Sequence, residues 1–531
     1  MNECKSISSN GGGICTNQSA NNSVIHISNL VELTKCQSNL DGGGIYAIVK
    51  NSNYLMISNI KLKLCKSTGK GGGIYADVSG SNNTFDITNQ VQIDECESQL
   101  DGGGIYVKLN NSGQIFIKDS ILNQCKSLKG NGGAIYADIS DNNSLLLISD
   151  QTNIKSCQSE LDGGAIYAII QSQGNLIITQ NSKISTCKSI SGKGGSIFID
   201  IIGLSSFQSS IVQISNLVQF ESSESFSDGG AIYAVIRQFG DLQIYRTKFI
   251  GCKSRSGKGG GIFVNQSNSY SSLQLTNQVE FTNCNSSLEG GAIYSIVANS
   301  STLKLSKIIF NSCESLTEKG GAIYTEISET GINPILYDEI QLNQCQCKLN
   351  GGGIYAIITN QGKLSIRKTT LNGCICKSGK GGGIYTEISG IGSLIQISDQ
   401  VKFIECESQD NVGSGGGLCS IIEKSGKLSI SQNCYFTDCK CTPGNGGGMY
   451  IEMKSLGVVD IQNQVYFSHC KALQSKQFTP PTGYGGAIFL LIYDNLDITQ
   501  NNINLKGALF NQNEAQNKGH SLFVVMSKLR E

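Results

Sequence analysis

Cysteine has the most reactive side chain in this sequence, and 21 of the 531 residues are cysteines. Most of them stand at one position of a repeated pattern, in which an apolar residue and two variable residues precede the cysteine. Thiols at so regular an interval could form disulfides, bind a metal ion or fill a core. The cysteines at this position are Cys4, Cys36, Cys65, Cys96, Cys125, Cys157, Cys187, Cys252, Cys284, Cys313, Cys345, Cys374, Cys406, Cys439 and Cys470.

If the repeats stack in register, neighbouring members of this cysteine column have parallel Cβ atoms about 4.8 Å apart. A disulfide requires Cβ atoms about 3.5–4.5 Å apart, and a tetrahedral zinc site requires ligands that converge from several directions. A straight row meets neither requirement. We therefore predict buried thiols that act as small apolar side chains, without a metal site or a cofactor. Cys347 and Cys376 lie outside the column, at equivalent positions of adjacent repeats, and are the best disulfide candidates.

Charged residues form a second column, immediately before the glycine run of each repeat. Acidic and basic residues largely alternate from one repeat to the next, and Asn or Ser fills some positions. Members of this charge ladder are Asp41, Lys70, Asp101, Asp162, Lys193, Asp228, Lys258, Glu289, Lys319 and Lys380. A slip by one repeat would place like charges together, so we predict that the ladder fixes the register of stacking.

Acidic residues in alternate repeats would lie about 9.6 Å apart, a separation used by paired carboxylates in glycoside hydrolases. A catalytic site, however, is a unique group of residues. No repeat adds a cluster of histidine, arginine or carboxylate side chains to this pattern, and the three histidines are scattered. The sequence therefore predicts a protein without catalytic residues, and a carbohydrate-active enzyme is the alternative.

An aromatic residue follows the glycine run of most repeats, and strand alternation places it on the face opposite the core. A fully exposed aromatic column would exceed the largest apolar patch of a typical monomer. Either neighbouring segments cover the column, or it is a binding face that could stack against sugars. This candidate interaction strip contains Tyr46, Tyr75, Tyr106, Tyr136, Tyr167, Tyr233, Tyr294, Tyr324, Tyr355 and Tyr385.

The elements that position these columns follow from the repeat itself. A pattern of two glycines, a small residue, an aliphatic residue and an aromatic residue recurs about 17 times at intervals of about 30 residues. Each repeat contains three short segments of alternating apolar and polar residues, separated by Asn, Ser and Gly. This predicts an all-β, right-handed parallel β-helix of about 17 coils, with about 30–31 residues and three strands per coil.

The repeat leaves no room for another domain, so residues 1–531 are expected to form one continuous β-helix domain. Irregular or inserted coils are expected near 202–228, 407–417 and 471–484. The pattern begins and ends in mid-repeat, which suggests a fragment of a longer protein or end-to-end self-association of coils with unpaired edges. Because the net charge is +0, we expect no nucleic-acid partner. No apolar run is long enough for a membrane span.

Two motifs resemble a known repeat family. The sequence GGAIY occurs at 229–233, 290–294 and 320–324, and Phe510-Asn511-Gln512-Asn513 follows near the end. These resemble the paired GGA[ILV] and FxxN motifs of polymorphic membrane protein repeats, which form β-helical passenger domains of adhesins. Cysteine replaces the family's asparagine in most copies. The Asn-, Ser-, Ile- and Lys-rich composition favours a protist relative.

The resemblance implies an adhesive or structural role in an extracellular or membrane-associated protein at the cell surface. Glycans or other surface proteins are the partners that this role implies. The sequence itself does not name a ligand.

Overall fold

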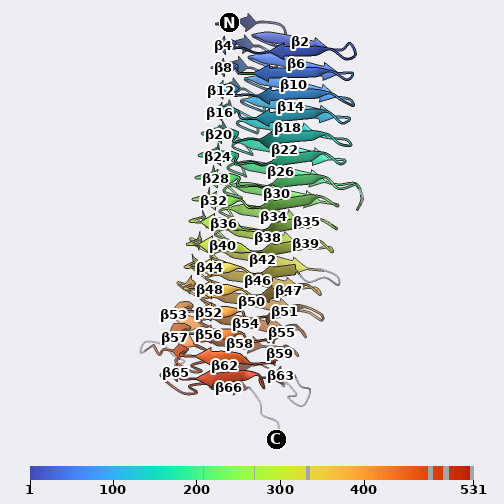
Figure 1. The fold of residues 1–531 in the computed structure, drawn as a ribbon. Coiled ribbons are helices and arrows are strands. Elements are labelled where there is room, and N and C mark those ends of the chain that lie inside the picture. Colours follow the sequence, from blue (N-terminus) through green and yellow to red (C-terminus); the bar gives the residue numbers. More distant parts are fainter. Residues whose placement is uncertain (207, 268, 330–334, 476–481, 494–501, 527–531) are drawn as a thin grey trace. The chain divides into compact units, whose positions relative to one another are not determined.

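The computed structural model describes residues 1–206, 208–267, 269–329, 335–475, 482–493 and 502–526. All elements in these ranges are strands, which stack in parallel as a β-solenoid of about 16 turns (Figure 1). The predicted fold is thereby confirmed. The chain divides into two compact units, Met1–Gln274 and Leu275–Glu531, and each is described by itself.

One coil of the first unit illustrates the plan. It contains β22 (Ile166–Gln171), β23 (Asn175–Ile178), β24 (Lys183–Ser185) and β25 (Lys188–Ser189). Each strand pairs in parallel with the equivalent strand of the next coil. Three of these strands match the prediction. The fourth, after the cysteine, has two residues and is too short to show an alternating pattern.

The strands that follow the glycine runs form one parallel sheet in each unit. In the first unit they are β2 (Ile14–Gln18), β6 (Ile45–Lys50), β10 (Ile74–Ser79), β14 (Ile105–Asn110), β18 (Ile135–Ile139), β22, β26 (Ile197–Ile202), β30 (Ile232–Arg237) and β34 (Ile262–Gln266). In the second unit they are β38 (Ile293–Val297), β42 (Ile323–Ser328), β46 (Ile354–Thr359), β50 (Ile384–Ser389), β54 (Leu418–Glu423), β58 (Met449–Met453), β62 (Ile488–Ile492) and β66 (Leu522–Met526).

Alternation along these strands separates the core from the outer face. In β22 the side chains of Ile166, Ala168 and Ile170 point inward and are fully buried, whereas Tyr167 lies on the outer face. Equivalent residues stack coil upon coil, as Ile166 does on Ile197. Burial of each such aliphatic side chain contributes about 1.5–3 kcal/mol, which makes the stacked coils stable together.

The two glycines of each run are needed for different reasons. The first has a left-handed backbone, with φ +65° at Gly163 and +63° at Gly194, a conformation that favours glycine. The second is approached by the backbone of the next coil. A Cβ atom at Gly164 would collide with the carbonyl oxygen of Gly195 and the backbone of Lys188.

Two of the segments expected to be irregular depart from the regular coil in the described residues. Strand β53 (Glu407–Ser414) shifts its register against β57 (Lys440–Asn445) between Gln409 and Gly413. Ser205 and Gln208 form an isolated antiparallel bridge. Within the expected irregular segments, residues 207 and 476–481 lie outside the described residues. No helix in the described ranges is long and apolar enough to cross a membrane.

Candidate functional site

The tyrosine strip forms a stack of rings on the outer face of the sheet whose strands follow the glycine runs. In the first unit, Tyr75 lies 4.8 Å from Tyr46 and 5.1 Å from Tyr106, centroid to centroid. In the second unit, Tyr324 lies 5.0 Å from Tyr355. These separations suit offset stacking. The rings thus form one column within each unit, as the repeat predicts.

Most of the strip is not accessible. The rings with less than one tenth of their surface exposed are Tyr106, Tyr233, Tyr294, Tyr324, Tyr355 and Tyr385. Those that are partly exposed are Tyr46, Tyr75, Tyr136 and Tyr167. Tyr355 is 0% exposed. An interaction through this strip can therefore use ring edges of the partly exposed members, mainly in the first unit.

Lysine side chains of the charge ladder help to cover the rings. The Nζ atom of Lys70 lies 4.4 Å from the ring centroid of Tyr106, one coil further on, and donates to its hydroxyl oxygen at 3.1 Å. Lys193 contacts Tyr233 in the same way, at 4.4 Å and 3.0 Å. A cation over an aromatic face is stabilising by about 0.5–2 kcal/mol. The charge ladder and the tyrosine strip thus form one layer.

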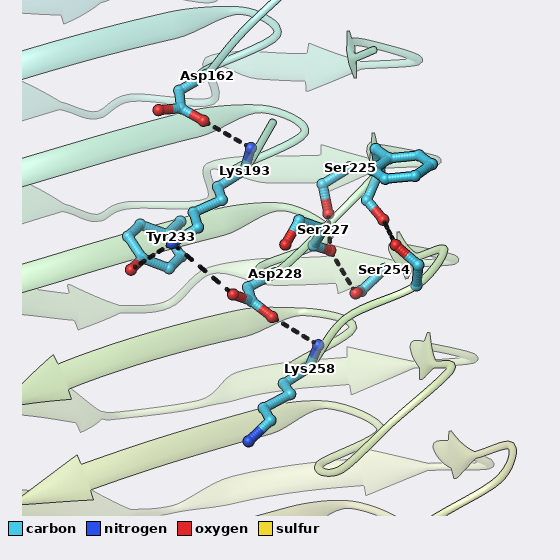
Figure 2. Close-up of polar contacts among 10 residues, drawn as sticks. Asp162, Lys193, Ser225, Ser227, Asp228, Tyr233, Ser254 and Lys258 are labelled. Carbon is cyan, nitrogen blue, oxygen red and sulfur yellow. Dashed lines mark hydrogen bonds and ion pairs between the residues drawn. The ribbon is translucent and has the colours of Figure 1, made fainter. Parts of the chain in front are cut away.

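The aspartates of the ladder accept hydrogen bonds from backbone N–H groups of the next coil (Figure 2). The Oδ1 atom of Asp162 accepts the backbone N–H of Lys193 at 2.8 Å, and Asp228 accepts that of Lys258 at 3.0 Å. Asp41 accepts the N–H of Lys70 at 2.8 Å. The Lys193–Asp228 ion pair is long, at 4.0 Å. Each of these three carboxylates therefore caps a turn amide of the next coil.

Glycine in the next coil makes room for each of these carboxylates. A Cβ atom at Gly192 would collide with Oδ1 of Asp162, and one at Gly257 would lie 2.5 Å from Oδ1 of Asp228. The dipeptide Gly-Lys after an Asp-containing repeat was the sequence signal for this contact. The alternation of side-chain charge by itself does not indicate that the carboxylate contacts the backbone.

Serine hydroxyls complete the same two-coil arrangement. Ser225 and Ser254, from adjacent coils, both donate to the carbonyl oxygen of Ser227, at 2.8 Å and 2.5 Å (Figure 2). Ser159 and Ser189 likewise both donate to the carbonyl oxygen of Leu161. The repeating structural unit is therefore a pair of coils, in agreement with the alternation of the charge ladder.

In the second unit, the ladder residues Glu289, Lys319 and Lys380 occupy the equivalent positions. Asn350 fills the place of an acid there, and its Oδ1 accepts the backbone N–H of Lys380 at 2.9 Å. Lys319 donates to the hydroxyl oxygen of Tyr355 at 3.4 Å. An amide oxygen can thus replace a carboxylate in this cap.

Replacing Asp162 with alanine should therefore destabilise the fold, whereas replacing it with asparagine should have little effect. Alanine leaves the partly buried N–H of Lys193 without its acceptor, which costs about 1.5–3 kcal/mol. Asparagine keeps an acceptor oxygen, as Asn350 does. Urea unfolding monitored by circular dichroism measures both variants. Equal stability of the two would show that the backbone cap does not matter.

A polar groove runs along another corner of the coil, beside the cysteine column. In the first unit it is an open hollow of about 270 Å³ lined by Leu64, Glu95, Glu97, Gln124, Lys126, Ser156 and Gln158. In the second unit a hollow of about 560 Å³ is lined by Ser312, Gln344, Gln346, Gly373, Ile375, Glu405, Glu407, Asp438 and Lys440. In both units these are the residues directly before and after the column cysteines. We call this feature the corner groove.

The groove arises because the chain bends sharply at this corner. The residue before each cysteine has a left-handed backbone, with φ 56° at Leu64, 53° at Glu95 and 54° at Gln124. The cysteine side chain then points inward, and its two neighbours point outward on either side of the bend. Residue types at this position vary from leucine to glutamate, so no sequence pattern marks the groove.

Three carboxylates line the groove of the second unit together. Glu405 and Glu407 flank one column cysteine, and Asp438 is the equivalent of Glu405 in the next coil. Lys440 forms an ion pair with Glu407 at 3.2 Å. Sequence analysis missed this cluster, because its members are separated by whole repeats and only stacking brings them together.

The cysteine column is buried as predicted, with Cys36 to Cys187 and Cys252 to Cys470 all at 0% exposure. Only the first column member, Cys4, is partly accessible. The thiols donate weak hydrogen bonds to carbonyl oxygens, for example from Cys470 to Phe436 at 3.4 Å. Asn513, in the following coil, donates to the carbonyl oxygen of Phe467 at 3.0 Å. Cysteine thus makes the hydrogen bond that asparagine makes in this motif.

The pair Cys347 and Cys376, considered above for a disulfide, lie opposite each other in neighbouring coils. Both are buried free thiols, so the bridge is not formed in the structure. Among the described residues, no group of three or more His, Cys, Asp and Glu side chains could hold a metal ion.

Comparison with known proteins adds no relative to this description: no protein-family model matches the chain, and no curated protein matches it.

Proposed function

We propose that this protein is a non-catalytic adhesive scaffold of a cell surface, which binds extended glycans along its corner groove. The observation that carries the proposal is repetition: the groove occurs at the same corner of the coil in both units and has the same kinds of lining residues. A repeated site suits a polymeric ligand, because equivalent groups recur about every 4.8 Å along the stack.

The chemistry of the lining supports a carbohydrate ligand. Side-chain amides of Gln124 and Gln158, the carboxylate of Glu97 and the ammonium group of Lys126 line one hollow. Such groups donate and accept hydrogen bonds with sugar hydroxyls. The resemblance to adhesin repeats supports the same role and an extracellular location.

The test is affinity electrophoresis of the whole chain through gels containing neutral or acidic polysaccharides. The double variant Gln124→Ala and Gln158→Ala should bind at least about tenfold more weakly, since each lost hydrogen bond contributes about 1 kcal/mol. The control, Gln114→Ala with Gln213→Ala, removes two amides from the outer face of a different sheet. Equal retardation of the two double variants would overturn the proposal. It would also be overturned if the polysaccharides retarded the wild type no more than a protein that does not bind them.

A carbohydrate-active enzyme is the second candidate, and the cluster of Glu405, Glu407 and Asp438 favours it. Paired carboxylates in one groove are the requirement for glycoside hydrolysis. If polysaccharides bound by the protein are also shortened, and Glu405→Gln or Glu407→Gln stops the cleavage without weakening binding, the enzyme replaces the scaffold as the proposed function.

A further inference from the structure

We propose that the buried cysteine column binds soft cations that take two thiolates in line, such as Cu(I), Ag(I) and Hg(II), between cysteines of neighbouring coils. The proposal is independent of glycan binding. It starts from the run of adjacent thiols in the first unit, where seven successive coils contribute a cysteine to the column: Cys4, Cys36, Cys65, Cys96, Cys125, Cys157 and Cys187.

The spacing of the coils fits this coordination. Rings at equivalent positions of neighbouring coils lie 4.8 Å apart for Tyr46 and Tyr75, and 5.0 Å apart for Tyr106 and Tyr136. A zinc–thiolate bond is about 2.3 Å long, and two metal–thiolate bonds of similar length in line would span about 4.6 Å. A straight row of thiols cannot surround a tetrahedral ion, but it places two sulfur atoms on opposite sides of a linear one.

The surroundings of the thiols favour a soft ion over a hard one. The column lies among aliphatic and aromatic side chains, and thiolates select soft metals. Metal binding would break thiol hydrogen bonds, such as those from Cys125 to the Ile93 carbonyl oxygen at 3.4 Å and from Cys157 to the Leu122 carbonyl oxygen at 3.7 Å. These bonds are weak because a thiol is a weak donor.

The balance of protons and charge identifies the best probe. Two thiols and one Hg(II) ion form two sulfur–mercury bonds and release two protons, which leaves a neutral group in the core. A monovalent ion releases the same two protons and leaves one negative charge, which is unfavourable in an apolar interior. Hg(II) should therefore bind more tightly than Ag(I) or Cu(I).

One natural interruption provides an internal reference. In the coil after Cys187, serine takes the column position, and Ser223 Oγ lies 2.5 Å from Ser196 Oγ in a hydrogen bond. Serine is thus accommodated in the column. Cys→Ser variants are the appropriate replacements, and Ser223→Cys is the appropriate addition.

The experiment compares two triple variants of the whole chain, refolded without oxygen in the presence of Hg(II) and counted by native mass spectrometry. The first, C36S/C96S/C157S, leaves no two neighbouring thiols between Cys4 and Cys187. The second, C36S/C65S/C96S, removes as many thiols but leaves Cys125, Cys157 and Cys187 adjacent. The seven thiols of the wild type form at most three separate pairs. The wild type should therefore hold three more ions than the first variant. The second variant should hold one more ion than the first.

Equal ion counts in the two triple variants would overturn the proposal, because they would show that thiols bind singly. A wild type that binds no Hg(II) would overturn it as well. Circular dichroism establishes whether the variants fold. If a triple variant does not fold, the Ser223→Cys variant tests the proposal instead. Its added thiol connects the cysteine run that ends at Cys187 with the run that begins at Cys252, so it should bind one ion more than the wild type. No additional ion in that variant contradicts the proposal.

Discussion

Replacing Gly103 with alanine is expected to destabilise the surrounding coils by at least about 3 kcal/mol, a loss typical of severe steric conflict. A Cβ atom at this position would collide with the backbone of Lys126 and with the carbonyl oxygen of Gly133 in the next coil. Backbone atoms cannot rotate away as a flexible side chain can. The two coils must therefore separate, and their parallel hydrogen bonds are lost.

The neighbouring residue provides the control. A Cβ atom at Gly104 would lie 2.7 Å from the Ala134 carbonyl oxygen and 3.2 Å from the Cys125 sulfur. Alanine already occupies the equivalent position at Ala134 and Ala165, so Gly104→Ala should cost much less than Gly103→Ala. Urea unfolding gives the loss of free energy, and hydrogen exchange shows whether the loss is confined to adjacent coils. Similar losses for both variants would contradict the steric argument.

Raising the pH above about 10 is expected to unfold the protein cooperatively. Burial, and then the nearby carboxylates of Asp162 and Asp200, raise the pKa of Tyr167 to about 12. Burial likewise raises the pKa values of Tyr106 and Tyr324. In the unfolded chain tyrosine ionises near pH 10.

The sign of the effect follows from these pKa values. Above pH 10 the folded state keeps these tyrosines protonated, whereas the unfolded state loses their protons. Their contribution to the free energy of unfolding is therefore fully present below pH 10 and is lost as the pH rises from 10 to the folded-state pKa. For a pKa of 12, the loss is about 1.4 kcal/mol per tyrosine at pH 11. The buried tyrosines of the strip act in the same direction, which makes the sum large.

Circular dichroism and phenolate absorbance, recorded together against pH, test this expectation. The part of the absorbance change that comes from the buried rings should coincide with the loss of the circular dichroism signal, because those rings ionise only when the coils open. Exposed rings such as Tyr270 and Tyr493 contribute a separate background. A Tyr167→Phe variant is the matched control, since Phe198 occupies the equivalent position in the next coil. It should lose less stability between pH 7 and pH 11 than the wild type. Phenolate formation by all 19 tyrosines near pH 10 with an unchanged circular dichroism spectrum would show that the rings of the strip are exposed.

The fold could be predicted because the sequence pattern that specifies each coil recurs at a regular interval. The glycine runs and alternating strands recur at one interval, and stacking converts them into sheets without further choices. The two-residue strand Lys188–Ser189 carries no such alternation and was missed. The outward side of Tyr167 followed from alternation, but its burial depends on contacts between coils. The lysine cover, for example Lys70 over Tyr106, arises from a residue of the preceding repeat.

The corner groove could not be predicted, because backbone conformation creates it and no residue type marks it. Leucine, glutamate and glutamine all adopt a positive φ before the cysteine, at Leu64, Glu95 and Gln124. The hydrogen bond by which Asp162 caps the next coil could not be predicted for a related reason. The sequence showed the alternation of charge, whereas the acceptor role required the position of the Lys193 backbone N–H group.

The two-coil period restricts how the gene for such a protein can change in length. Asp162 fits against Gly192 of the next coil, and Gly192 lacks the side chain that would displace it. Loss of the single coil that contains Lys193 would bring Asp162 against Ser227 and Asp228, where a Cβ atom and a second carboxylate would meet it. Loss of two coils restores the original neighbours. Duplications and deletions that natural selection retains should therefore span multiples of about 61 residues, twice the repeat of about 30 residues.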